Sequence, residues 1–255
     1  MIDCRGTAIH MKIIAITNQK GGTAKTTSTA ALGVLLSRRG IPVHLIDMDP
    51  QADLSAAFGI DGSNSRLFDC LRDQSRLEVI KVAESLTISP SSLQLLRAES
   101  ELLTSTSREF VLRTALRNTE LPDEGVVLID CPPSLGVLSV AALSAAQGIC
   151  VVVQPGGFEL QTLVHLGQTV DLLRQYVNPE LQTIGAIVTN SHRRRSITSQ
   201  VVDELASQYS VLGTIRSDAR IVYATTAGSI HRLRSSSAME DYDAVADRIA
   251  EWLAV

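Results

Sequence analysis

The amino-acid sequence predicts an α/β fold in which a doubly wound, mostly parallel sheet carries helices on both faces. Five short runs rich in valine and isoleucine are nearly continuous rather than alternating, which is typical of strands covered on both faces. Helical patterns lie between these runs, so strands and helices alternate as in βαβ units with right-handed crossovers. Aromatic residues make up only 4% of the chain, which favours helices packed on a buried sheet over an aromatic-rich sandwich.

The predicted elements follow one another in regular order along the chain. The first strand is IIAIT (13–17), and the first helix covers 26–40, where apolar residues recur at helical spacing and a basic last turn ends at Gly40. The further predicted strands are VHLID (43–47), VVLID (126–130), ICVVVQP (149–155) and TIGAIVTN (183–190). The further predicted helices are SVAALSAAQG (139–148), LQTLVHLGQTVDLLRQYV (160–177), SITSQVVDELASQY (196–209) and the C-terminal MEDYDAVADRIAEWLAV (239–255).

We expect residues 11–255 to form a single domain. The chain has 255 residues, 45% of them hydrophobic, which suffices for a packed core, and no linker, repeat or low-complexity segment divides it. Residues 1–10 are expected to be an N-terminal extension, either disordered or an artefact of the assigned start. Both Met1 and Met11 are candidate starts, because the first strand begins directly after Met11.

The composition argues against several classes of protein. No apolar run approaches the roughly 20 residues of a membrane span, and the first ten residues lack the apolar centre of a signal peptide. The four cysteines are far apart and include no C-x-x-C pair, so we expect a reduced, cytoplasmic setting and no metal site built within one chain. Because the net charge is −4, affinity for a polyanion would have to come from a local basic patch.

The first predicted strand is followed by the loop NQKGGTAKTT (18–27), which has the properties of a phosphate-binding loop. The general pattern G-x-x-x-x-G-K-[ST] would place glycines at 19 and 24, where this chain has Gln19 and Ala24. Backbone N–H groups must nevertheless converge on the phosphates at the start of a helix, and Gly21 and Gly22 allow that close approach. Ala24 is tolerable only at negative φ, because positive φ costs an alanine on the order of 1 kcal/mol or more.

Carboxylates follow the next strands, at the edge of the sheet where this loop is expected. In parallel α/β sheets, ligands bind beyond the carboxyl ends of the strands. Asp130 ends VVLID and is suited to hold Mg²⁺, directly or through water. Asp47 and Asp49 lie in LIDMDPQ and could orient an attacking water. A solvated carboxylate is the commoner fate of one such residue, but three at the same edge as the loop indicate a hydrolytic site.

These segments together resemble the deviant-Walker ATPases of the ParA/MinD family, most closely the small, Soj-like ParA partition ATPases. The resemblance rests on KGGTAKTT, VHLIDMDPQADLS and VVLIDCPPSLGVLS, and also takes in ISPSSLQLLRAESELL (88–103) and the region 211–224. It covers nearly the whole chain from Met11, and the first three motifs in this order and spacing are highly specific. It implies a P-loop NTPase fold with the deviant Walker A loop K-G-G-x-G-K-[ST], in which Gln19 is ordinary and Ala24 is a departure.

The resemblance also implies roles for the loop. ATP and Mg²⁺ would be the cofactors, and two subunits would sandwich two ATP molecules. Lys20 would reach across to the partner's phosphates, Lys25 would act on the phosphates of its own subunit, and Thr26 would bind Mg²⁺. The further nucleotide contacts implied by position are Gly21, Gly22, Thr23, Ala24 and Thr27.

The roles of the carboxylates and of Asn190 follow from the same resemblance. Asp49 would orient the hydrolytic water, while Asp130 and Asp47 would lie on the Mg²⁺ side. Asn190 follows the fifth strand where a contact to adenine is expected, although a strand-end asparagine is often only a cap or turn. The sequence NSHR at this point is not the N-K-x-D of a guanine site, which favours ATP over GTP.

The segment SHRRRS (191–196) is the densest positive charge in an otherwise acidic chain. Cations at the start of a predicted helix oppose its dipole, so an anionic partner explains them better than solvation does. The resemblance implies that the ATP-bound dimer binds non-specific DNA through Arg193, Arg194 and Arg195, and that Arg220 occupies a further basic position. It also implies a nucleoid-associated protein whose slow ATP hydrolysis is stimulated by a centromere-binding or cargo adaptor protein.

Two other hypotheses about the function remain open at this point. MinD-like members of the family end in a basic amphipathic helix that lies on membranes. Here the last helix carries five acidic residues against Arg248, so we expect no membrane partner and a core-facing stripe of Val245, Ile249, Trp252 and Leu253. An electron-transfer ATPase like the nitrogenase iron protein would need two cysteines per subunit, and only Cys131 is suitably placed.

Overall fold

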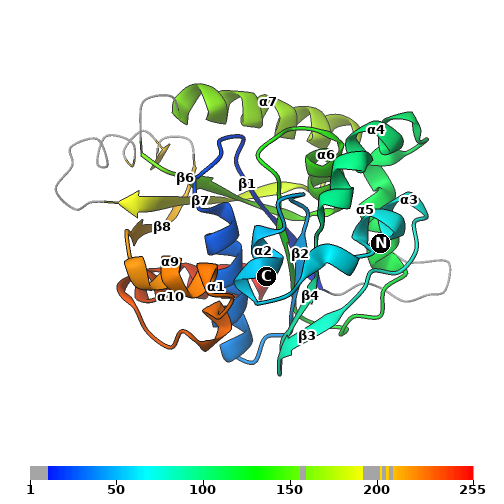
Figure 1. Cartoon of the computed structure of the whole chain (residues 1–255). Helices are drawn as coiled ribbons and strands as arrows, with labels where there is room; N and C mark the ends of the chain where they lie inside the picture. Colours follow the sequence, from blue (N-terminus) through cyan, green and yellow to red (C-terminus); the bar gives the residue numbers. More distant parts are fainter. Residues whose placement is uncertain (1–10, 156–158, 192–201, 203–204, 207–208, 255) are drawn as a thin grey trace.

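The structure is a computed structural model that describes residues 11–155, 159–191, 202, 205–206 and 209–254. Its eight strands form one sheet in the order β3-β4-β2-β5-β1-β6-β7-β8. All neighbouring pairs are parallel except β3 and β4, which are antiparallel. Helices cover both faces of this sheet (Figure 1), so the predicted fold class is confirmed.

The strands and helices have the following bounds. The strands are β1 Lys12–Thr17, β2 Val43–Asp47, β3 Ile80–Ala83, β4 Leu86–Ser89, β5 Val126–Asp130, β6 Gly148–Val153, β7 Gln182–Ser191 and β8 Val211–Arg216. The α-helices are α1 Lys25–Arg38, α2 Asp53–Ala57, α3 Leu67–Arg72, α4 Ala98–Glu101, α5 Val111–Arg117, α6 Val137–Ala145, α7 Glu159–Tyr176, α9 Ala219–Thr226 and α10 Ser237–Leu253. Five short 3-10 helices are η1 Gly62–Asn64, η2 Leu93–Arg97, η3 Leu102–Thr104, η4 Arg108–Phe110 and η5 Ile230–Arg232.

The sheet separates two hydrophobic cores, and the alternation of side chains along each strand distributes them between the two. In β1, Ile13 and Ala15 belong to the core beneath α3, α5, α6 and α7, whereas Ile14 and Ile16 belong to the core beneath α1, α9 and α10. Successive side chains of a strand point to opposite faces, so a strand buried on both faces must be apolar throughout. This explains why the central strands have continuous rather than alternating apolar sequences.

The position of β1 defines where a ligand is expected. In the sheet, β1 lies between β5 and β6. From β1 the chain passes through α1 to β2, which lies on the β5 side of β1, and it later crosses to the opposite side of β1 to form β6. Parallel sheets of this kind bind ligands in the crevice at such a switch in strand order, beyond the carboxyl ends of the strands. The loop between β1 and α1 therefore lies at the expected binding edge.

The C-terminal helix α10 is part of the core beneath α1. Its residues Val245 and Ile249 are fully buried, and Trp252 and Leu253 pack against the same core, so the predicted core-facing stripe is confirmed. In the described part of the chain, no helix is both long and apolar enough to cross a membrane.

Helix α9 is fixed to α2 by a close contact between two glycines. Gly59 and Gly228 both have positive φ, and a Cβ added to Gly228 would lie 2.8 Å from the Cα of Gly59. Phe58 and His231 also stack beside this contact, with ring centroids 6.2 Å apart. The position of α9 on this face of the molecule is therefore set by backbone packing as well as by its apolar side chains.

Candidate nucleotide-binding site

The loop after β1 is anchored to the neighbouring strands by two buried polar side chains. Asn18 donates from Nδ2 to the carbonyl oxygen of Val152 at 2.7 Å, and its Oδ1 accepts from the Lys20 amide at 3.2 Å. Thr189, near the end of β7, donates from Oγ1 to the carbonyl oxygen of Thr23 at 2.8 Å. Both anchoring side chains are buried. β6 and β7 thus hold the loop at the carboxyl edge of the sheet.

The outer part of the loop is open. Gly22 has φ of +74°, a conformation that favours glycine, and a Cβ added to Gly21 or Gly22 would meet no atom of the described residues within 4 Å. Lys20, Gly21 and Gly22 are exposed. The glycines therefore leave room for a ligand to approach the backbone N–H groups closely, which is what a phosphate requires.

Lys25 opens α1 and its amine points back into the loop. Its side chain is buried, and Nζ donates to the carbonyl oxygen of Lys20 at 3.3 Å. Among the residues that the structure describes, no side chain caps the N-terminus of α1, and its first turn contains no acidic residue. The 14-residue helix therefore directs a positive dipole end and a lysine toward the same open space.

Ala24 has a left-handed backbone conformation, with φ of 68° and ψ of 32°. We expected alanine to be tolerated at this position only at negative φ, and the structure shows that this expectation is wrong. The geometry follows from its position: Ala24 is the N-cap of α1 and its carbonyl oxygen accepts the first helical hydrogen bond, from the Ser28 amide at 2.9 Å. An alanine in this region costs about 1–2 kcal/mol relative to the right-handed helix, so the loop stores strain.

Replacing Ala24 with glycine is expected to stabilise the protein by up to about 1 kcal/mol, because glycine relieves the strain but adds entropy to the unfolded chain. A gain of that size should raise the melting temperature by about 2–4 °C in a protein of this length. Thermal unfolding of A24G beside A52G, a second alanine N-cap at φ of 58° in α2, measures the effect at both positions. A lower melting temperature for A24G would show that Ala24 is not strained.

Two buried carboxylates lie side by side beneath the loop. Asp47 at the end of β2 and Asp130 at the end of β5 are register partners, and both side chains are buried. Thr26, in the first turn of α1, donates from Oγ1 to Oδ2 of Asp130 at 2.7 Å. Thr29 lies one turn further along α1, and its Oγ1 is 3.4 Å from Oδ1 of Asp130. The structure thus brings the predicted Thr26, Asp47 and Asp130 together.

The environment of these carboxylates favours a cation. Burial raises the pKa of Asp47 to about 7, although hydrogen bonds from Ser55 and the Asp49 amide oppose that shift. Burial and the charge of Asp47 also raise the pKa of Asp130, while the hydrogen bond from Thr26 and the charge of Lys25 act in the other direction. Two adjacent carboxylates in a dry site repel each other when ionised, and a bound cation relieves that repulsion.

Asp49 differs from the other two carboxylates because it is only half-buried. Its Oδ1 accepts from the Gln51 amide at 3.0 Å, and its carbonyl oxygen accepts from Oγ of Ser91 at 2.6 Å. Asp47, in contrast, is held on the inside by Ser55, whose amide and Oγ both donate to Oδ2, at 2.8 Å and 2.7 Å. Asp49 is therefore the carboxylate of this segment that solvent can reach.

The residues present fit Mg²⁺ bound together with phosphates. Within the described residues, no three His, Cys, Asp or Glu side chains gather to form a metal site supplied by protein alone. Mg²⁺ commonly takes only one or two protein ligands and completes its octahedron with waters and substrate phosphates. Thr26 and Asp130 offer such a partial ligand set beside the open glycine loop.

The other predicted site residues lie in varied environments. Thr27 is half-buried in the first turn of α1, and Asn190 is exposed near the end of β7 with φ of 50°, a conformation that asparagine tolerates. Arg220 is exposed on α9, and Arg193, Arg194 and Arg195 lie outside the described residues. Cys131 is buried, and burial raises the pKa of its thiol, which does not suit a cluster ligand shared between subunits.

Four residues that position this site were not predicted as site residues. Asn18 and Thr189 anchor the loop, and Ser55 and Ser91 hold the segment of Asp47 and Asp49. Asn18 and Ser55 lie in motifs that are visible in the sequence, but their hydrogen-bond partners are distant along the chain. Thr189 lies in the predicted strand 183–190 and Ser91 in the segment 88–103, but nothing in either stretch marks these residues as supports for the loop or for Asp49.

Comparisons with known proteins agree with this geometry. A family model described as an AAA domain matches residues 11–183. Soj of Bacillus subtilis, a sporulation initiation inhibitor protein, is 36% identical over 203 residues, covering 78% of this chain and 80% of Soj. The chromosome partitioning protein ParA of Myxococcus xanthus is 36% identical over 210 residues, covering 80% of this chain and 74% of ParA.

Solved structures share the fold over nearly the whole chain. Cobyrinic acid a,c-diamide synthase from Mycobacterium smegmatis, solved with an ATP analogue and magnesium, superposes with a TM-score of 0.82 at 30% identity and 95% coverage of each chain. A putative plasmid partition protein from Borrelia burgdorferi bound to AMPPNP has a TM-score of 0.83 at 23% identity, covering 95% of this chain and 99% of its own, which shows the fold alone. From the family model and the extent of its identity to Soj and ParA, the chain belongs to the ParA/Soj family of partition ATPases.

Proposed function

We propose that this protein hydrolyses ATP to ADP and phosphate with Mg²⁺, dimerises on binding ATP, and binds non-specific DNA to segregate or position DNA or another cargo. The observation that carries the proposal is the cluster at the mouth of the glycine loop. There the buried Lys25 amine lies beside the hydrogen bond from Thr26 to Asp130. A separate cargo adaptor protein would bind this protein and stimulate its ATP hydrolysis.

Each residue of the cluster has a role that follows from its position. A bound Mg²⁺ would supply positive charge that stabilises the charge developing during phosphoryl transfer. Thr26 would hold Mg²⁺, with Asp130 orienting its hydroxyl and Asp47 keeping the local charge negative. Lys25 and the N-terminal amides of α1 would bind the phosphates, and Asp49 would orient the attacking water.

The dimer is supported by the exposed tip of the loop. Lys20 lies on the outer side of the loop at an exposed position, whereas Lys25 is buried behind it. A single subunit therefore leaves the phosphate-binding edge open to a second subunit, and Lys20 would contact the phosphates of the partner. The packing of α10 argues against the MinD-like alternative, because its apolar face is occupied by the protein core rather than available to a membrane.

DNA binding is tested by reversing charge at three positions. Changing Arg193, Arg194 and Arg195 to glutamate should abolish binding to a random duplex, because contacts of this type are mainly to phosphate and steeply dependent on salt. Dimerisation with ATP should persist in the same variant. Fluorescence anisotropy at several salt concentrations measures the binding. The matched control is a variant in which three other exposed arginines are changed to glutamate, namely Arg66, Arg76 and Arg108. DNA affinity that survives the first triple change at low salt would contradict the assignment.

A further inference from the structure

Helix α1 carries a buried serine one turn after the phosphate-binding loop. Ser28 is fully buried, and its Oγ donates to the carbonyl oxygen of Ala24, the N-cap of the helix, at 2.8 Å. The Ser28 amide donates to the same oxygen at 2.9 Å. A serine inside a helix often bonds to the carbonyl group four residues earlier, so this contact alone would be ordinary. The Ser28 hydroxyl, however, has a second partner.

This second partner is Tyr242 on the C-terminal helix α10. Its phenol oxygen lies 2.8 Å from Oγ of Ser28, and Tyr242 is only 1% exposed. Ser28 has one hydroxyl hydrogen, which it donates to Ala24, because a carbonyl oxygen can only accept. The phenol therefore donates to Ser28, and a chain of hydrogen bonds runs from Tyr242 through Ser28 to Ala24. Burial raises the pKa of Tyr242, so its hydroxyl stays protonated and able to donate.

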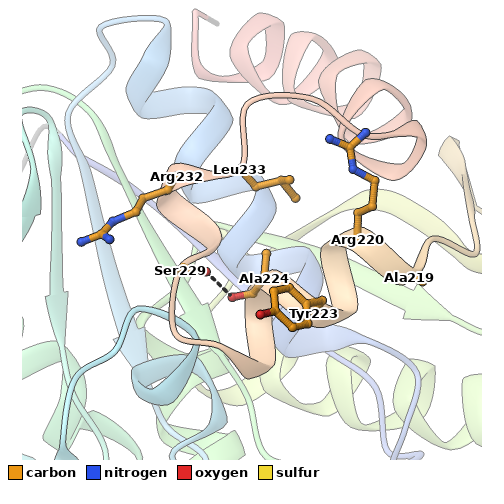
Figure 2. A pocket seen from close by; sticks show the side chains of 7 residues that line it. All are labelled: Ala219, Arg220, Tyr223, Ala224, Ser229, Arg232 and Leu233. Atoms are coloured by element: carbon orange, nitrogen blue, oxygen red, sulfur yellow. Dashed lines mark hydrogen bonds between the residues drawn. The ribbon is translucent and has the colours of Figure 1, made fainter.

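The backbone around Tyr242 is fixed by contacts of its own. The neighbouring Asp241 accepts from the Arg216 amide and from Nε of the same arginine, both at 2.8 Å, which ties α10 to the end of β8. The segment between α9 and α10 runs beside α1 (Figure 2), and Arg38 of α1 donates to the carbonyl oxygen of Leu233 in this segment at 2.8 Å. The Tyr242 hydroxyl therefore reaches Ser28 from an anchored helix.

The carbonyl group of Ala24 determines the direction of the Lys25 amide. The C=O and N–H groups of a trans peptide lie in one plane and point in opposite directions. Because the Ala24 oxygen is turned along α1 toward Ser28, the Lys25 N–H points out of the start of the helix, as one of the first N–H groups that have no partner within it. Ala24 has a φ of 68°, and strained conformations of this kind persist only where surrounding contacts hold them. The chain from Tyr242 supplies such a contact.

We propose that Tyr242 is a positioning residue for ATP, which acts through Ser28 to fix the Ala24 carbonyl group and so aims the Lys25 amide at the phosphates. The inference rests on the proposed function and adds a residue of the last helix to the support of the first loop. The effect should be on binding rather than on the chemical step, because the phosphates accept from this amide both before and during the reaction. An interaction that is equal in the substrate complex and the transition state changes KM and leaves kcat unchanged.

The test compares Tyr242→Phe, Ser28→Ala and the double variant, each in the whole chain with ATP and Mg²⁺. Y242F keeps the buried ring and removes only the hydroxyl. Ser144→Ala is the matched control, because Ser144 is also fully buried in a helix, and its Oγ donates to the carbonyl oxygen of Val140, four residues earlier, at 2.7 Å. Phosphate release gives KM and kcat, and thermal unfolding gives the loss of stability that each missing hydroxyl causes.

The expected results separate positioning from stability. S28A should raise KM for ATP about 3- to 10-fold, as the loss of one hydrogen bond does, with kcat within about two-fold of the unchanged protein. Y242F should raise KM by about two-fold or more, and the double variant should raise it no further than S28A does, because Tyr242 acts through Ser28. S144A should lower the melting temperature and leave KM unchanged.

Different outcomes separate this inference from the proposed function. If Y242F hydrolyses ATP with the KM of the unchanged protein, Tyr242 does not position the loop and the inference is overturned, while the proposed function stands. Increases in KM that multiply in the double variant would also overturn it, since the two hydroxyls would then act independently. An equal increase in KM for S144A would show a general effect of lost stability instead. An unchanged protein that neither binds nor hydrolyses ATP would contradict the proposed function, and the inference with it.

Discussion

Replacing Lys25 with alanine is expected to lower ATP turnover by about 100- to 1,000-fold, the range found when one preorganised donor to a developing charge is removed. The reason is that the Lys25 side chain is buried and its amine donates to the carbonyl oxygen of Lys20 at 3.3 Å, within the loop that carries Gly21 and Gly22. At that position a point charge is poorly screened by water, so its loss is not compensated by solvent. ATP binding should weaken as well, because the lysine contacts the phosphates before and during the reaction.

Phosphate release under saturating ATP and Mg²⁺ measures the turnover of K25A, and equilibrium binding of a labelled ATP analogue measures its affinity. Lys81→Ala is the control, since Lys81 is exposed on β3 at the edge of the sheet. Its turnover should equal that of the unchanged protein. A K25A variant with turnover within about two-fold of the unchanged protein would show that the loop does not bind the reacting phosphate, since removing such a donor costs about 100-fold or more.

Replacing Asp49 with alanine is expected to lower turnover by about 100- to 10,000-fold, the contribution usual for a positioned acid or base. ATP affinity should stay close to that of the unchanged protein, because Asp49 is only half-buried and lies outside the pair of buried carboxylates. The protein should therefore accumulate in its ATP-bound dimer. Single-turnover hydrolysis and the mass of the complex with ATP test both parts of this expectation.

The control for Asp49 is Asp53→Ala, which removes a carboxylate from the first turn of the neighbouring helix α2. Burial and the charge of Asp49 raise the pKa of Asp53, so the two carboxylates share one electrostatic environment. D53A should nevertheless turn over ATP at a rate within a few-fold of the unchanged protein. Full turnover by D49A would remove Asp49 from the mechanism, and an equal loss in both variants would point to a general charge effect.

The central strands and the binding edge could be predicted because their physical cause is local. Strands β1, β2, β5, β6 and β7 appear in the sequence as continuous runs of branched residues, since both faces of each strand are covered by helices. The side chains at their carboxyl ends then lie at one edge by topology alone. For this reason Asp47 and Asp130 were placed beside the loop, and the structure shows them as register partners.

The edge of the sheet and the support of the site could not be predicted in the same way. Strands β3 and β4 are only four residues each, and in β8 only Leu212 and Ile215 are buried, so none produces a long apolar run. Ser55 and Ser91 act through hydrogen bonds to Asp47 and Asp49 that depend on the tertiary fold. Most of the predicted helix over 196–209 and the basic cluster at 193–195 lie outside the described residues and stay predictions.

The conformation of Ala24 shows where a sequence rule and the fold disagree. The rule allows alanine at this position only at negative φ, yet the start of α1 imposes a φ of 68°. The packing of α1 against the sheet and α10 therefore outweighs a local strain of about 1–2 kcal/mol. Loops that bind phosphate often store strain of this size, because the surrounding structure fixes the backbone.

The most direct test of the proposed function is the mass of the protein in solution measured with Mg²⁺ and a non-hydrolysable ATP analogue, with ADP, and without nucleotide. Sedimentation in the presence and absence of duplex DNA gives both the oligomeric state and the binding to DNA in one experiment. We predict twice the monomer mass with the ATP analogue alone, a monomer with ADP, and DNA binding only by the dimer. A protein that stays monomeric when saturated with the ATP analogue, or binds DNA equally without nucleotide, would contradict the proposal.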